Sequence, residues 1–156
     1  MTLTTLAIHV EAWLQAELGA QRSILAALAR IEAAARAGSS AELASSGHEL
    51  EGLLAPAGAR DGRRAALLAK LATALDLPLQ GVTLSGLFAR LSTAEVETTR
   101  LERARVELRE VVVSVVKAGR RMAALAQYHR GLLDELCQLL CAGSPSPEGH
   151  LVDARG

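Results

Sequence analysis

The chain has 156 residues, half of them apolar and only 2% aromatic, and its seventeen basic residues are balanced by seventeen acidic ones. A net charge of zero provides no global field to attract nucleic acid or an anionic membrane surface. The wealth of alanine and leucine, with few aromatic residues, favours helices over strands. We therefore expect an all-α fold, an elongated antiparallel helical bundle or coiled coil of three main helices with one short extra helix.

The first helix is predicted from about Thr5 to Ala37. Its apolar residues recur with the 3.6-residue period of a helix packed in a bundle, at Leu6, Val10, Leu14, Leu18, Leu25 and Leu28. Gly38 is expected to end this helix. Ser39 to Glu42 form a capping box, which starts a second helix almost at once. Two helices joined by so short a link should lie antiparallel.

The second helix is interrupted by residues that disfavour helix, at Gly47, Gly52, Pro56, Gly58 and Gly62. An interior proline loses a backbone donor and clashes with the preceding turn, so we predict a kink or short break between Ala55 and Gly62. A helical stripe returns from Ala65 to Leu75, followed by a loop at Leu77–Gly81. Thr83 is the predicted N-cap of a short helix that runs through Leu91.

A local basic cluster falls in this part of the chain, at Arg60, Arg63, Arg64 and Lys70. It contains one acid, Asp61, and no aromatic side chain on which a base could stack. We therefore expect a solvated helix face here, not a nucleic-acid site.

A very long C-terminal helix is predicted from Ser92 to Ala142, about 75 Å at 1.5 Å per residue. Ser92 to Glu95 read as its capping box, and Gly143 as its stop. Apolar residues alternate in steps of three and four as a heptad seam, broken in polarity only by His129: Leu101, Ala104, Leu108, Val111, Val115, Ala118, Met122, Leu125, His129, Leu132, Leu136 and Leu139.

A second row of apolar or small residues lies beside this seam, at heptad positions e and b when Leu101 is position a: Val112, Val116, Gly119, Ala123, Ala126, Leu133, Cys137 and Leu140. The apolar face is thus wider than a two-helix seam requires. Either the first two helices cover it in a closed three-helix bundle, or its C-terminal part stays open for an amphipathic helix of a partner.

The domain organisation expected is one helical domain at 1–143 and a flexible tail at 144–156, which contains two prolines. The N-terminus has no basic leader before its apolar residues, so it does not resemble a signal peptide. No apolar run approaches the roughly 20 residues of a membrane span. We expect a soluble, cytoplasmic protein without membrane insertion.

Three stretches together resemble the FlgN-like flagellar export chaperones. They are the link at 37–43, the segment 75–91 (LDLPLQGVTLSGLFARL) and the terminal helix with the glycine at its end. The resemblance covers nearly the whole chain in the order of its elements. It implies a cytoplasmic α-helical chaperone that binds the C-terminal helices of hook-filament junction proteins and delivers them for type III secretion.

The resemblance also implies where the client binds, because the family captures it with the C-terminal part of the last helix. That region corresponds to residues 125–140, where the apolar face is also wide. The partner-binding residues expected there are Leu125, Tyr128, Leu132, Leu133, Leu136, Cys137 and Leu140. The export gate and the ATPase complex are further partners that the resemblance implies. The alternative is a self-associating coiled-coil adaptor, a homodimer without a secretion client.

Catalytic and metal chemistry find little support in the sequence. His129, Cys137 and Cys141 fall at different heptad positions, and no further cysteine pair completes a zinc site. We expect His129 to be a core or seam histidine and Cys137 a small apolar filler, with both thiols reduced. Phosphate-binding loops and paired buried carboxylates are missing as well, so we expect no enzyme, no cofactor and no metal.

Overall fold

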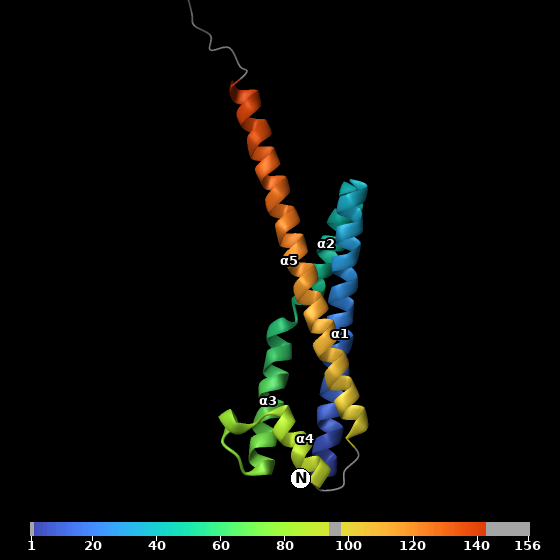
Figure 1. The fold of residues 1–156 in the computed structure, drawn as a ribbon, viewed down its shortest axis with the longest axis vertical. Coiled ribbons are helices and arrows are strands. Elements are labelled where there is room, and N and C mark those ends of the chain that lie inside the picture. Colours follow the sequence, from blue (N-terminus) through green and yellow to red (C-terminus); the bar gives the residue numbers. More distant parts are fainter. Residues whose placement is uncertain (1, 94–97, 143–156) are drawn as a thin grey trace, which may run out of the picture. The chain divides into compact units, whose positions relative to one another are not determined.

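The structure is a computed structural model that describes residues 2–93 and 98–142, and all regular elements in these ranges are helical. In chain order they are α1 (Leu3–Ala37), α2 (Ser40–Leu54), α3 (Ala57–Leu75), the 3₁₀ helix η1 (Leu79–Gly81), α4 (Leu84–Thr93) and α5 (Thr99–Ala142) (Figure 1). The predicted all-α class is confirmed. The predicted stop at Gly143 and tail at 144–156 lie outside the described residues, as do the side chains of 80, 84, 92–93 and 140–142.

By its internal contacts the chain divides into two units, Met1–Arg120 and Arg121–Gly156. The first unit contains α1 to α4 and the N-terminal half of α5. The described part of the second unit is the C-terminal half of α5.

The C-terminal end of α1 and the start of α2 follow the predicted capping residues, while α1 begins two residues before the predicted Thr5. Thr2 caps α1 by accepting the Thr5 amide at 3.3 Å. Gly38 ends this helix in the left-handed conformation with φ 67°, where a side chain would be strained. Ser39 then accepts the amide of Glu42 at 3.4 Å and starts α2. The two predicted boundaries at Gly38 and Ser39 are confirmed.

Helices α1 and α2 pack side by side and antiparallel (Figure 1). The guanidinium of Arg30 donates from Nε to one carboxylate oxygen of Glu49 at 3.2 Å and from Nη2 to the other. These residues are nineteen apart in sequence, on opposite sides of the Gly38 turn, as an antiparallel pair requires. The prediction that the short link makes the two helices antiparallel is therefore confirmed.

The break between α2 and α3 falls at Ala55 and Pro56, inside the predicted range, and helix resumes earlier than expected, at Ala57. Proline has no backbone N–H, so it cannot continue the ladder of α2. The last carbonyls of α2 lack helical partners. One of them, Leu53 O, accepts a hydrogen bond from Arg60 Nη1 at 3.1 Å.

The hydrophobic core of the first unit draws on four helices and one loop. Its buried members are Leu6, Ala7, Val10, Leu14, Leu71, Leu75, Val82, Leu87, Phe88, Leu91, Leu101 and Ala104. The short helix α4 supplies Leu87, Phe88 and Leu91. Thr83 caps α4, as predicted, by accepting the Gly86 amide at 3.0 Å.

The start of the long helix was wrongly predicted. Ser92 and Thr93 end α4, and α5 begins only at Thr99. The remaining residues of the supposed capping box, 94 and 95, lie outside the described residues. Glu102 lies in the first turn of α5, where a carboxylate favours a helix N-terminus. The helix therefore begins seven residues after the predicted start.

Candidate partner-binding surface

The heptad seam of α5 changes from buried to exposed along its length. Leu101, Ala104 and Ala118 retain only 2%, 2% and 4% exposure. The seam residues between Leu108 and Leu125 are buried or half-buried, and every described side chain from 126 to 139 is exposed. One continuous pattern thus has a buried end in the first unit and an exposed end in the second.

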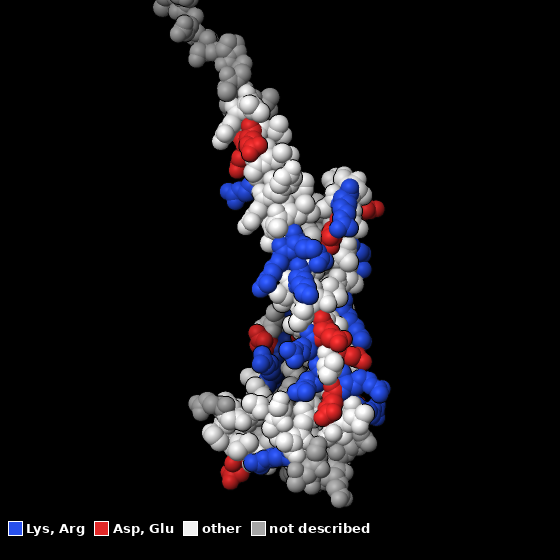
Figure 2. Space-filling view, in the orientation of Figure 1, with Lys and Arg blue, Asp and Glu red and all other residues white. Residues whose placement is uncertain are grey.

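We call the described leucines at the exposed end the terminal strip: Leu125, Leu132, Leu133, Leu136 and Leu139. Leu125 is half-buried, while the other four are 43%, 60%, 48% and 69% exposed, in that order. Single exposed leucines are ordinary, but a contiguous row of them on one helix face indicates an interaction surface. Figure 2 shows few charged side chains over this half of α5 on the face in view.

The predicted partner-binding residues are found on or beside this strip. Leu125, Leu132, Leu133 and Leu136 belong to it. Tyr128 is 66% exposed, and its ring meets that of His129 edge-on, with centroids 5.8 Å apart. Cys137 is an exposed free thiol, so it does not fill a core within this chain. The Leu140 side chain lies outside the described residues.

The structure also bears on the closed-bundle alternative and on His129. Val112 and Val116, in the neighbouring row, are 38% and 46% exposed. The closed-bundle alternative is therefore wrong for these two residues. His129 occupies a seam position but is exposed. A seam side chain is buried only where a second helix faces it, which the pattern of a single helix cannot specify.

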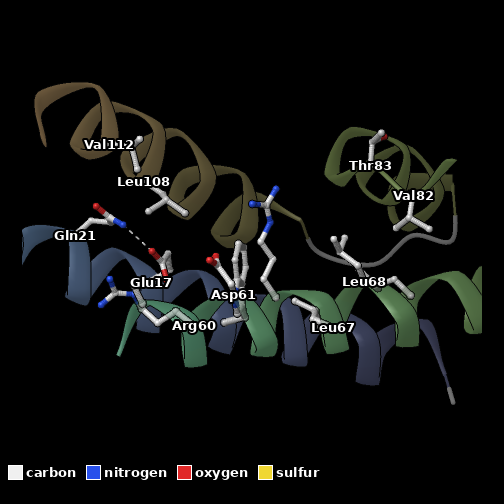
Figure 3. A pocket seen from close by; sticks show the side chains of 14 residues that line it. Glu17, Gln21, Arg60, Asp61, Leu67, Leu68, Val82, Thr83, Leu108 and Val112 are labelled. Carbon is white, nitrogen blue, oxygen red and sulfur yellow. Dashed lines mark hydrogen bonds between the residues drawn. The ribbon is translucent and has the colours of Figure 1, made fainter. Parts of the chain in front are cut away.

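A second candidate is a cavity of about 560 Å³ in the first unit, which the sequence analysis missed. Figure 3 shows Glu17 and Gln21 of α1 and Leu108 and Val112 of α5 around it. Gln21 Nε2 donates to Glu17 Oε1 at 2.7 Å. One face of α3 supplies Ala57, Arg60, Asp61, Arg64, Leu67, Leu68 and Leu71, and Trp13, Val82 and Thr83 complete the lining. The α3 lining residues recur in steps of three and four, and this spacing was the signal in the sequence from which the lining face could have been found.

The expected solvated face is found for Arg63, Arg64 and Lys70, which are exposed, whereas Arg60 is half-buried. Arg60 and Arg64 line the cavity together with two acids, Glu17 and Asp61. The four charges cancel, and the hydroxyl of Thr83 already accepts the Gly86 amide. The lining residues that the structure describes include no histidine.

Residues 2–93 and 98–142 contain no group of three or more His, Cys, Asp or Glu side chains placed to bind a metal ion. Within the same ranges no helix has the length and apolar character needed to cross a bilayer.

Comparisons of the chain with protein-family models, with curated proteins and with solved structures gave no match.

Proposed function

We propose that this protein captures an amphipathic helix of a partner protein on the terminal strip. One observation carries the proposal: the same heptad seam is buried at Leu101 and Ala104 and exposed from 126 to 139. Heptad seams are surfaces for packing against another helix. The exposed end is therefore the part of α5 that is available to a second molecule.

The strip defines what the partner must present. Burying each half-exposed leucine removes apolar surface worth on the order of 1 kcal/mol. Association itself costs several kcal/mol, so one anchoring side chain is not enough. The partner therefore needs a row of apolar residues at i, i+3, i+4 and i+7, as in other helix-in-groove complexes. Tyr128, at the edge of the strip, offers a ring and a hydroxyl to that partner.

We further propose that the clients are the C-terminal helices of hook-filament junction proteins, delivered in the cytoplasm to the flagellar type III export machinery. The support for this identity is the resemblance at 37–43 and 75–91 to FlgN-like chaperones. The exposed strip supports it independently, because it lies in the stretch where that family holds its clients. The role is non-enzymatic and needs no cofactor or metal, and the export gate and ATPase complex are proposed as further partners.

Calorimetric titration of the full chain with synthetic C-terminal peptides of the junction proteins from the same genome tests this proposal. We expect saturable one-to-one binding with a negative heat-capacity change, the mark of buried apolar surface. No heat at high peptide concentration, at each of two temperatures, would refute the flagellar client.

A matched pair of variants tests the site. Leu133→Glu places a charge in the strip and should weaken peptide binding at least about tenfold. Gln127→Glu adds the same carboxylate at an exposed position outside the strip and should leave binding unchanged. At a concentration where the chain is monomeric, both variants should melt like the unmodified chain. Loss of cooperative melting in Leu133→Glu alone would assign Leu133 to the core.

A further inference from the structure

The terminal strip is complementary to a reversed copy of itself. In an antiparallel pair of helices each a residue packs against a d residue of the other helix, e faces e, and g faces g. When residue 122 is set opposite residue 139 of a second copy, the seam forms three kinds of layer, each occurring twice by symmetry. They are Met122 with Leu139, Leu125 with Leu136, and His129 with Leu132.

The flanking positions agree with this register. At the e positions Ala126 lies next to Leu133 of the second copy, so a small side chain faces a large one. At the g positions Tyr128 lies next to Glu135 of the second copy, where a phenol hydroxyl can donate to a carboxylate. Each of these pairs also occurs twice, and none brings like charges together.

The two neighbouring registers are worse. Sliding the copies by one heptad toward the first unit sets Leu136 against Ala118, which is already buried at 4% exposure. Sliding the two copies by one heptad away from the first unit sets Glu135 against Glu135 of the second copy, which brings like charges together. This register also loses the layers formed by Met122 and Leu125. Only the middle register pairs all the exposed seam residues, from His129 to Leu139, together with the half-buried Met122 and Leu125, and leaves the buried Ala118 outside, over eighteen residues or about 27 Å.

We propose that, in the absence of a client, the terminal strip is covered by the terminal strip of a second copy of this chain, antiparallel and with residue 122 opposite residue 139. The inference concerns the regulation of the strip described under the proposed function and rests on it only for the identity of the client. The pairing keeps a row of leucines out of water until a client helix displaces the second copy.

Sedimentation equilibrium of the full chain tests the pairing. We expect a concentration-dependent dimer whose dissociation constant rises at least about tenfold in Leu136→Glu, because the substitution enters two layers at once. Gln127→Glu, a substitution at an exposed position outside the strip, should leave the dissociation constant of the dimer unaltered. His129→Leu should tighten the dimer, since it removes a polar residue from two seam layers. A monomer at every concentration, or a dimer that Leu136→Glu leaves intact, would overturn the proposal.

Disulfide cross-linking tests the register. In chains carrying Cys137→Ser and Cys141→Ser, we would mix an Ala126→Cys variant with a Leu133→Cys variant under mild oxidation. The stated register predicts the mixed disulfide, because only that pair brings the two β-carbons close enough. A self-disulfide of the Ala126→Cys variant would contradict it, since that product belongs to the register shifted toward the first unit.

Adding the junction-protein peptide to the dimer separates this inference from the proposed function. Conversion of the dimer into a one-to-one peptide complex supports both. A monomeric protein that still binds the peptide refutes the self-pairing and leaves the client proposal standing. A dimer with the stated cross-link that no peptide dissociates supports the self-pairing and refutes the client proposal.

Discussion

The two halves of α5 share one heptad pattern but differ in surroundings. In the first half Leu101 and Ala104 join a core built with α1, α3 and α4, and side chains at the helix edge pair with α1. Glu107 accepts from Arg22 at 3.1 Å, and Arg100 meets Glu11 at 3.3 Å. In the second half the leucines of the terminal strip from Leu132 to Leu139 are exposed.

The difference shows that the position of an apolar face on a helix and the burial of that face are two separate properties. Periodicity determines which face of a helix is apolar, because side chains three and four apart lie on the same side. It does not determine what covers that face. In this chain the first half of the seam contributes to the core of the first unit, and the second half is exposed from 126 to 139.

The largest expected effect is a stability contrast between the halves. Leu101→Ala should lower the free energy of unfolding by about 3 kcal/mol, since it deletes a core side chain and leaves a cavity. Leu136→Ala, the same change on the terminal strip, should alter it by less than about 0.5 kcal/mol. Urea unfolding followed by the fluorescence of Trp13 measures both at low protein concentration. Equal losses of unfolding free energy in the two variants would show that the two halves of the seam do not differ in burial.

A smaller effect is expected from two glycine variants of opposite sign. Gly131 lies inside α5 with open space where a β-carbon would be, so Gly131→Ala should stabilise the local helix by roughly 0.5–1 kcal/mol. Gly38→Ala forces a side chain into the left-handed region and should destabilise the first unit by about 1 kcal/mol. Circular dichroism during thermal melting measures both. Destabilisation by Gly131→Ala would mean that another element packs closely there.

Helix ends with a single dominant signal were predictable from the sequence. Gly38 ends α1 through a backbone conformation that glycine adopts without strain, and Ser39 and Thr83 cap the helices that follow. These are local effects of one residue on its own backbone. The start of α5 was missed because the spacing of Ser92 and Glu95 fits a capping box, although Ser92 lies at the end of α4. Which helix such a residue joins depends on tertiary packing, which no local rule contains.

The sites were predictable to different degrees. The strip was found because its leucines are periodic and the resemblance marks the same stretch, yet its exposure is a property of the folded chain. The cavity was missed because its α3 lining alternates charged residues such as Arg60 and Arg64 with leucines, which also fits a solvated face. A void forms where helices fail to meet, and that is decided by the packing of α1, α3 and α5 together.

Hydrogen exchange along α5 is the most direct test of the central claim that its seam is buried in one half and open in the other. In the full chain at a concentration where it is monomeric, we predict slow exchange at 101–118 and fast exchange at 126–139, because exposed helix opens locally. A saturating junction-protein peptide should slow the second stretch and leave the first unchanged. Equal protection of both stretches in the free monomer would contradict the claim, since it would show that the terminal strip is already covered within one chain.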